Sequence, residues 1–371
     1  MSADFLYSRY SAIGCNFSSQ IYILALRSLF GYVECPYPAQ ACHIAFYAFR
    51  LYSRFMFDVL VIGVGAAGYT AAIYAARYKL KTLIVGAEEG GMGITAADVG
   101  NWPGEIEIRG PDLMEKFKKH ATSFEEVTHK IGRVEMLEKM ADGHFKATMQ
   151  NGDIYEARTI ILATGSNKRH LGIPGEKEFS GKGVTYCATC DAFFYKNKTV
   201  AVLGGGDSAV EGAAIAAQVA AKVYLVHRRD TFRAEPYWVE KVKSKENVVF
   251  VLERNVLEVL GEQKVAGIKL DKAFEGSDIL AVDGVFIEIG SNPSVDLAVQ
   301  LGCRIDEKGF MDVDKSMRSS TPGVFGAGDV TNGSNYFAQF TTAAGEGATA
   351  ANGVFNYLQG DQHHGWMQGA C

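Results

Sequence analysis

The sequence has little of what a membrane-spanning or nucleic-acid-binding protein needs. In its 371 residues no apolar stretch approaches the roughly 18 that cross a bilayer. The net charge is -5 and there is no long basic run, so neither a membrane nor a nucleic-acid partner is expected. Apolar residues make up 48% and charged residues 21%, which is ordinary for a soluble globular protein, and the length suggests two domains.

Cysteine is also scarce, and its pattern excludes a secreted disulfide framework. The seven cysteines are Cys15, Cys35, Cys42, Cys187, Cys190, Cys303 and Cys371. An odd number with one close pair predicts a reducing, cytoplasmic compartment in which that pair is catalytic. The alternative for a CxxC is structural zinc, but such a site needs about four ligands and no second pair exists, so no metal is expected.

The two ends of the chain differ from the rest. Residues 1–55 are rich in aromatics and contain only two acidic residues, and a strand pattern begins directly after Met56. We interpret Met56 as the natural start and the upstream stretch as mis-assigned coding sequence. The alternatives are an organellar transit peptide, because the stretch is acid-poor and contains arginines, or a secretory hydrophobic region at 21–26. The tail 361–371, with Trp366 and Cys371, is expected to be passive; the alternative is an accessory redox thiol.

A first glycine-rich turn follows the predicted strand 57–62. The turn Gly63-Val-Gly-Ala-Ala-Gly68 opens an alanine-rich helix expected over about 66–78, and the next strand leads to Glu88. The glycines permit a tight turn and close approach to a pyrophosphate, which rests on the positive helix N-terminus. An acid about 20 residues further on, as Glu88 is, accepts hydrogen bonds from a ribose 2′-hydroxyl. The pattern predicts a dinucleotide site.

The strand–turn–helix–strand plan is repeated over 199–226, with the turn Gly204-Gly-Gly-Asp-Ser-Ala209. Here the second strand ends in the basic run 227–229, and Arg233 follows. A basic cluster in place of the acid accommodates a 2′-phosphate, which predicts that this site prefers NADPH over NADH. The alternative is a solvated basic surface loop.

By elimination the first site holds a flavin, and a distant segment supports this. Residues 321–329 form a short apolar strand pattern that ends in Asp329, which can bond the ribitol chain of FAD. A helix expected from about Thr341 would direct its N-terminus at the flavin ring. The alternative for Asp329 is a simple turn residue.

Between the two glycine turns lies Cys187-Ala-Thr-Cys190, followed by Asp191. Flanked by two dinucleotide sites, this pair is interpreted as a dithiol that exchanges electrons with bound cofactors. A CxxC at the start of a helix has a lowered thiol pKa, because the helix dipole favours the thiolate.

These motifs, in this order, resemble the low-molecular-weight, bacterial-type NADPH-dependent thioredoxin reductases over about 57–358. The most specific are Cys-Ala-Thr-Cys-Asp at 187–191, Gly-Gly-Gly-Asp-Ser-Ala at 204–209, His-Arg-Arg-Asp-Thr-Phe-Arg-Ala at 227–234, Asp-Val-Gly-Asn-Trp-Pro-Gly at 98–104 and Gly-Ala-Gly-Asp at 326–329. The resemblance implies an α/β fold of two Rossmann-like three-layer domains. The NADPH domain, 168–294, is inserted into a discontinuous FAD domain, 57–167 and 295–360, and a homodimer is expected.

The resemblance also implies roles for individual residues. Electrons pass from NADPH through FAD and the Cys187–Cys190 disulfide to thioredoxin; Cys190 faces the flavin, Cys187 attacks the partner and Asp191 is the general acid–base. The FAD contacts are Gly63, Gly65, Ala66, Ala67, Gly68, Glu88, Gly91, Asn101, Ala163, Thr164, Gly165, Gly328, Asp329 and Gln339. The NADPH contacts are Gly204, Gly206, Asp207, Ser208, His227, Arg228, Arg229 and Arg233. Thioredoxin docks on Lys182, Phe193 and Phe194, although core packing is the alternative for the two phenylalanines.

Two positions depart from the family pattern, and two related activities compete. Ala338 stands where an arginine is usual and Met92 where a polar residue is usual, both on the flavin side. A ferredoxin-fed relative is disfavoured by the basic run 227–229. A peroxidase-feeding relative is disfavoured because residues 1–55 are too few for its upstream domains. The family alternates contact of the disulfide and of NADPH with the flavin by rotating its two domains, and we expect the same here.

Overall fold

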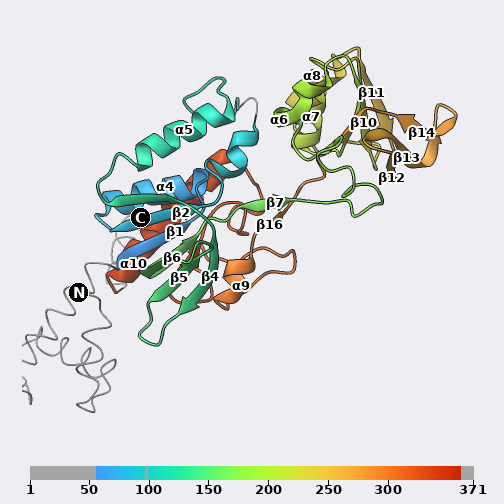
Figure 1. Ribbon diagram of the computed structural model, residues 1–371. Helices are drawn as coiled ribbons and strands as arrows, with labels where there is room; N and C mark the ends of the chain where they lie inside the picture. The colour runs from blue at the N-terminus through green and yellow to red at the C-terminus, as the bar shows by residue number, and fades with distance from the viewer. Residues whose placement is uncertain (1–55, 97–98, 361–371) are drawn as a thin grey trace, which may run out of the picture.

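The computed structural model describes residues 56–96 and 99–360. The predicted extension 1–55, Asp98 in the 98–104 motif, and the tail with Trp366 and Cys371 lie outside the described residues. Within the described ranges no helix is both long and apolar enough to cross a membrane. The described chain forms two α/β lobes joined by a pair of short strands (Figure 1).

The first lobe is built on a mostly parallel sheet. Its parallel strands are β3 (Val127–Ile131), β2 (Thr82–Gly86), β1 (Phe57–Ile62), β6 (Ile154–Leu162) and β17 (Val324–Gly326), in that spatial order. The antiparallel strands β5 (Phe145–Met149) and β4 (Val134–Lys139) extend the sheet from the first half of β6. Val59, Leu60 and Val61 are all buried, because helices or other elements cover both faces of a parallel sheet. This explains why residues 59–62 of β1 are a continuous run of apolar residues rather than an alternating one.

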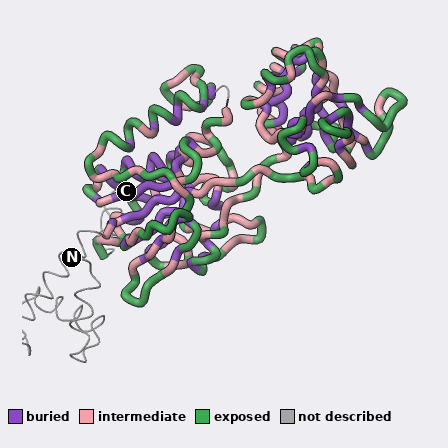
Figure 2. Tube along the Cα trace, viewed as in Figure 1, coloured by how far each residue is buried: buried purple, intermediate pink, exposed green. Residues whose placement is uncertain are grey.

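Helices cover both faces of this sheet. On one face α4 (Ala66–Arg77), α5 (Gly110–Ala121) and α10 (Phe340–Leu358) enclose an apolar core. On the other, α9 (Asp296–Gln300) packs beside β4 over a second core. The 3-10 turn η2 (Gly91–Thr95) precedes α5. Helix α10 begins at Phe340, one residue before the predicted start. Figure 2 shows the buried chain concentrated inside each lobe.

The second lobe repeats the parallel plan on a smaller scale. Its strands, in spatial order, are β11 (Val248–Leu252), β10 (Lys222–His227), β9 (Thr199–Leu203), β15 (Gly284–Ile287) and β8 (Val184–Thr185). An antiparallel sheet of β12 (Val256–Gly261), β13 (Val265–Phe274) and β14 (Ser277–Ala281) packs on one face. The other face carries α6 (Ala188–Asp191), η3 (Ala192–Tyr195), α7 (Asp207–Ala216) and α8 (Pro236–Lys243). The predicted fold class is confirmed, with the second unit inserted into the first.

The two crossings between the lobes pair with each other. Strand β7 (Ser166–Lys168) runs antiparallel to β16 (Ser291–Pro293), with Ser166 opposite Pro293 and Lys168 opposite Ser291. Arg169 extends the pairing, because its backbone N–H donates to the Gly290 carbonyl at 2.9 Å. The lobes are therefore connected by a hydrogen-bonded ribbon rather than by two independent linkers.

Helices α4 and α10 pack closely because small residues line their contact. A Cβ atom added to Gly347 of α10 would lie 2.2 Å from the carbonyl oxygen of Ala67 in α4. No real Cβ approaches backbone so closely, so the spacing of the two helices depends on this glycine. Gly345 lies two residues earlier on the same helix, is exposed, and has open space around its Cβ position.

We expect Gly347→Ala to lower the free energy of unfolding by about 1–3 kcal/mol, since the added methyl forces two backbones apart. The matched variant Gly345→Ala should raise stability by up to about 1 kcal/mol, because alanine is the better helix former and meets no neighbour. Urea unfolding of both variants measures the difference. Equal effects of the two substitutions would contradict the close α4–α10 contact.

Candidate active site

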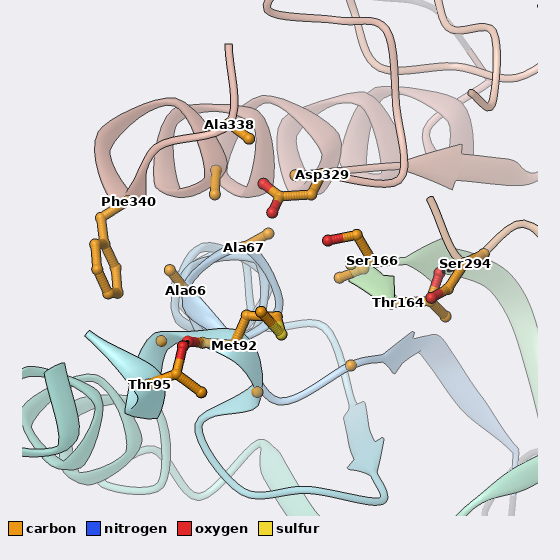
Figure 3. Close-up of a pocket in the computed structure, with 18 of the residues that line it drawn as sticks. Ala66, Ala67, Met92, Thr95, Thr164, Ser166, Ser294, Asp329, Ala338 and Phe340 are labelled. Atoms are coloured by element: carbon orange, nitrogen blue, oxygen red, sulfur yellow. Dashed lines mark hydrogen bonds between the residues drawn. The ribbon is translucent and has the colours of Figure 1, made fainter. Parts of the chain in front are cut away.

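A cavity of about 1370 Å³ opens where β1, β2, β6 and β17 of the first lobe end. Ligands of parallel α/β sheets bind at these carboxyl ends of the strands, at the point where the connections diverge. The wall of the cavity also includes residues of the second lobe, from the start of α7 and from α8. Figure 3 shows side chains from both ends of the first-lobe sequence directed into this space.

The first glycine turn forms one wall of the cavity. Gly63 has φ +124°, and a Cβ there would lie 1.9 Å from the Ala163 carbonyl oxygen, so no other residue fits between β1 and β6. Helix α4 begins directly after Gly65 and has no acidic side chain in its first turn. The positive end of its dipole is therefore left for an anion in the cavity, as a pyrophosphate requires.

The structure brings most of the predicted flavin contacts into this one cavity. Those that line it are Gly63, Gly65, Ala66, Ala67, Glu88, Gly91, Asn101, Ala163, Thr164, Gly165, Gly328, Asp329 and Gln339. Gly68 is the exception. A Cβ there would lie 1.8 Å from the Gly63 carbonyl oxygen, so only glycine lets the first turn of α4 pack against the glycine turn. Residues from four separate segments of the sequence thus meet at the ends of the strands.

Two of these residues, 238 positions apart in the sequence, contact each other directly. The Asn101 side-chain amide donates to Gln339 Oε1 at 3.0 Å. Gln339 is also the N-cap of α10, where its backbone N–H donates to Thr342 Oγ1 at 3.1 Å in a reciprocal capping box. The start of α10 is therefore fixed at the edge of the cavity.

Asp329 directs a carboxylate into the cavity (Figure 3). Burial raises the pKa of Asp329, and the nearby charge of Glu346 raises it further. Glu346 is itself buried and accepts hydrogen bonds from the Gly328 N–H at 2.7 Å and the Thr331 hydroxyl at 2.8 Å. Within the described part of the chain Asp329 has no comparable donor, so its oxygens are open to a ligand. A buried acceptor of this kind suits the hydroxyls of a sugar-alcohol chain.

Several lining residues were not predicted from the sequence. They are Phe340, Thr95, Ser166 and Ser294, which surround the cavity together with Met92 and Ala338, the two positions that were expected on the flavin side (Figure 3). The Thr164 hydroxyl donates to the Ser294 carbonyl at 2.8 Å, which ties the ends of the two linker strands. None of these positions carries a motif of its own. Only their placement beside the glycine turn makes them candidates.

The second glycine turn gathers the predicted basic cluster. The Arg233 N–H donates to the Gly205 carbonyl at 2.8 Å, and the His227 ring lies against Gly205 and stacks on Phe232. Burial lowers the pKa of His227, and the neighbouring arginine charges act in the same direction. Arg228 and Arg229 follow β10 directly and are exposed. The turn after β9 and the cations after β10 therefore lie at the same end of this parallel sheet.

Of the predicted nicotinamide contacts, Asp207 and Ser208 at the start of α7 also line the first cavity. Asp207 is fixed there because its Oδ1 accepts the Glu235 N–H at 2.7 Å. Tyr237 and Trp238 of α8, which the sequence did not single out, line the same side. The second nucleotide turn therefore faces the space in which the first one opens.

Cys187 and Cys190 form a disulfide at the start of α6. The N-terminal half of that short helix is held by the sulfur itself, because Cys187 Sγ accepts the Cys190 N–H at 3.2 Å. Neither cysteine is among the described residues that line the cavity, and Cys190 is exposed. In this arrangement of the lobes the second nucleotide turn lines the cavity, whereas the disulfide does not.

Asp191, the next residue, has a partner that sequence reasoning missed. The Thr185 hydroxyl donates to Asp191 Oδ2 in a short hydrogen bond, and its oxygen accepts the Cys187 N–H at 3.3 Å. The Thr185 hydroxyl therefore links the Asp191 carboxylate to the backbone of Cys187. Burial and the charge of Asp191 raise the pKa of Tyr195, which lies on the same side.

The three residues considered for docking are all at the surface. Phe193 and Phe194 are 71% and 81% exposed, so core packing, the alternative interpretation of this pair, is wrong. Lys182 is also exposed. Two large apolar rings that follow the disulfide in the chain are therefore accessible at the surface. Among the residues that the structure describes, no group of histidines, cysteines and acids is arranged to hold a metal.

Comparison with known proteins agrees with this geometry. The family model described as pyridine nucleotide-disulphide oxidoreductase matches residues 57–347. A thioredoxin reductase of Listeria innocua is 40% identical over 308 residues, which cover 82% of this chain and 94% of that protein. A Pseudomonas fluorescens protein named glucosaminate ammonia-lyase is 40% identical over 318 residues, 82% and 97% of the two chains. The crystal structure of Lactococcus lactis thioredoxin reductase in its FR conformation matches with a TM-score of 0.77 and 36% identity, over 82% of this chain and 99% of that one.

Proposed function

Since the chain belongs to the pyridine nucleotide-disulphide oxidoreductases, and among them to the low-molecular-weight thioredoxin reductases, we propose that it reduces thioredoxin with electrons from NADPH. The observation that carries this proposal is the Cys187–Cys190 disulfide, held in the same lobe as a nucleotide turn that faces a second nucleotide cavity. Neither nucleotide turn alone indicates that the substrate is a disulfide. The two turns together with an exposed disulfide do indicate it.

The cavity of the first lobe fits FAD. Its volume, the α4 N-terminus for the pyrophosphate, Glu88 for the ribose and the open carboxylate of Asp329 for the ribitol match the parts of that cofactor. When bound, FAD supplies the two-electron relay between the nicotinamide and the disulfide. The second turn, with Arg228 and Arg229 exposed at the end of β10, would hold NADPH.

The protein's own part in the reaction is thiol–disulfide exchange. In the reduced pair, the Cys187 thiolate attacks one sulfur of the thioredoxin disulfide, which forms a mixed disulfide and releases the other sulfur as a thiolate. The Cys190 thiolate then attacks the Cys187 sulfur, which restores the disulfide and releases the second thioredoxin sulfur. Asp191 transfers the protons that the released thiolates take up, and the Thr185 hydroxyl holds its carboxylate next to the pair.

The position of the disulfide requires two arrangements of the lobes. Here the second nucleotide turn lines the cavity and the disulfide does not, and Phe193 and Phe194, which follow the cysteines in the chain, are exposed. To receive electrons the disulfide must exchange places with the nucleotide turn. We propose rotation of the second lobe about the β7–β16 ribbon. A cross-link that fixes the lobes should block turnover; unimpaired turnover in a locked protein would contradict it.

The other activity in the comparisons is ammonia elimination from glucosaminate, the reaction named for the Pseudomonas relative. Such an elimination has no use for a dithiol, whereas this chain forms the disulfide and carries Asp191 beside it. Reduction of thioredoxin is therefore the better-supported function. We further propose a homodimer in the cytoplasm, with Lys182, Phe193 and Phe194 as the docking surface for thioredoxin.

The first test is oxidation of NADPH by the flavin-loaded protein. The loss of NADPH absorbance is measured with and without the thioredoxin of the same host. Oxidation should depend on thioredoxin and disappear in Cys187→Ser. If NADPH bleaches the flavin but thioredoxin adds nothing, the partner is wrong. If NADPH leaves the flavin oxidised, the donor is wrong and reduced ferredoxin is tested next.

The Arg228→Ala/Arg229→Ala variant should raise KM for NADPH about 10- to 100-fold and change KM for NADH little, because only NADPH has the 2′-phosphate that these cations bind. Steady-state kinetics with both cofactors measures the ratio. Lys272→Ala, an exposed cation elsewhere in the same lobe, is the matched control and should leave both KM values unchanged. Equal losses for the two cofactors would count against a 2′-phosphate site.

Thr185→Val should slow the reduction of thioredoxin by the pre-reduced protein about tenfold, because the isosteric side chain cannot hold the Asp191 carboxylate. Thr185→Ser keeps a hydroxyl in the same place and should retain most of the rate. Stopped-flow mixing of reduced protein with oxidised thioredoxin measures both variants. A valine variant as fast as the serine variant would show that the hydroxyl does not position Asp191.

A further inference from the structure

A buried carboxylate lies behind the disulfide, at a position that the proposed mechanism does not use. Glu288 directly follows β15, and its side chain is only 5% exposed. Its Oε1 accepts the backbone N–H of Ala188, the first residue of α6, at 3.1 Å. Because Ala188 follows Cys187, the carboxylate lies one peptide away from the sulfur that is proposed to attack thioredoxin.

The other oxygen of this carboxylate is paired with the linker. Lys168 belongs to β7, and its Nζ lies 2.6 Å from Glu288 Oε2, with the lysine side chain 21% exposed. The Glu288 backbone also contacts the second nucleotide turn, since a Cβ on Gly204 would lie 2.2 Å from the Glu288 carbonyl oxygen. One residue therefore touches the linker, the nucleotide turn and the disulfide helix.

The charges of this pair lie beside the peptide that follows Cys187. Burial raises the pKa of Glu288, while the charge and hydrogen bond of Lys168 and the Ala188 N–H oppose that rise and favour the carboxylate. A buried ion pair contributes little net stability compared with apolar side chains of similar volume. Its position against the first peptide of α6 points to an effect on the neighbouring sulfur instead.

We propose that Glu288 and Lys168 are positioning residues: Glu288 anchors the start of α6 and opposes formation of the Cys187 thiolate, and Lys168 offsets its charge. The pair thereby sets the reactivity of Cys187 after the disulfide is reduced. The inference rests on the proposed function in assigning Cys187 as the attacking thiol. Because Lys168 lies in the linker, the same contact joins the linker to the reactive helix.

Other titratable groups on the elements next to this sulfur remain the same in every variant below. On its own helix and the following turn are Asp191 and Tyr195, and α7, which packs on α6, carries Glu211. Tyr186, the residue before Cys187, donates to Glu176 at 3.0 Å and contacts His170 at 2.8 Å. Differences between variants of Glu288 and Lys168 therefore report on that pair.

The test uses the full chain with its flavin, carrying Cys190→Ser so that Cys187 is the only active-site thiol. The reduced protein is alkylated with iodoacetamide over a pH series, and the Cys187 peptide is quantified by mass spectrometry because other cysteines also react. In this background Glu288→Gln should lower the pH midpoint by about 0.5–1 unit, since the Lys168 cation is then unbalanced. Adding Lys168→Met should return the midpoint close to that of the parent, since both charges are then gone.

Glu262→Gln, an exposed acid of the same lobe, is the matched control and should leave the midpoint unchanged. If Glu288→Gln does not fold, Lys168→Met alone replaces it and should raise the midpoint, because the carboxylate loses its cation. An unchanged midpoint in Glu288→Gln, or an equal shift in the single and double variants, would overturn the proposal. Alkylation requires neither NADPH nor thioredoxin, so this outcome is independent of whether thioredoxin is the substrate.

Discussion

The structure depends on one repeated constraint, the close approach of a glycine turn to the neighbouring parallel strand. In the first lobe a Cβ on Gly63 would lie 1.9 Å from the Ala163 carbonyl oxygen, and in the second a Cβ on Gly204 would lie 2.2 Å from that of Glu288. Each contact holds a helix start at the carboxyl end of its sheet. Both nucleotide sites follow from that geometry, because the helix N-terminus and the free N–H groups of the turn face the ligand.

Because one lobe is inserted into the other, the two nucleotide sites are joined through a single connection. The chain leaves the first sheet after β6 and returns to it before β17, and the two crossings pair as β7 and β16. Two lobes joined by so short a ribbon are suited to the rotation proposed above. In this arrangement the second nucleotide turn lines the cavity and the disulfide does not, which is the relation that the proposed rotation would reverse.

Three buried carboxylates of this scaffold differ in their partners. Glu346 accepts hydrogen bonds from backbone and hydroxyl groups, and Glu288 is paired with Lys168, while Asp329 is left for a ligand. A buried carboxylate without donors is costly, so its ionised form indicates a function or a partner. The partners of Glu288 come from segments far apart in the chain, which explains why this residue was not prominent in the sequence.

The sequence by itself determined the two strand–glycine–helix units, the redox pair and the order of the domains. These are local patterns: Phe57–Ile62 was predicted with its observed bounds, and α10 began one residue from its predicted start. Only the tertiary structure decided which distant groups meet, such as Asn101 with Gln339 and Thr185 with Asp191, and that Phe193 is exposed. The physical reason is that hydrogen bonds and burial of this kind depend on how sheets and helices pack, and a one-dimensional pattern specifies the elements but not their contacts across the fold.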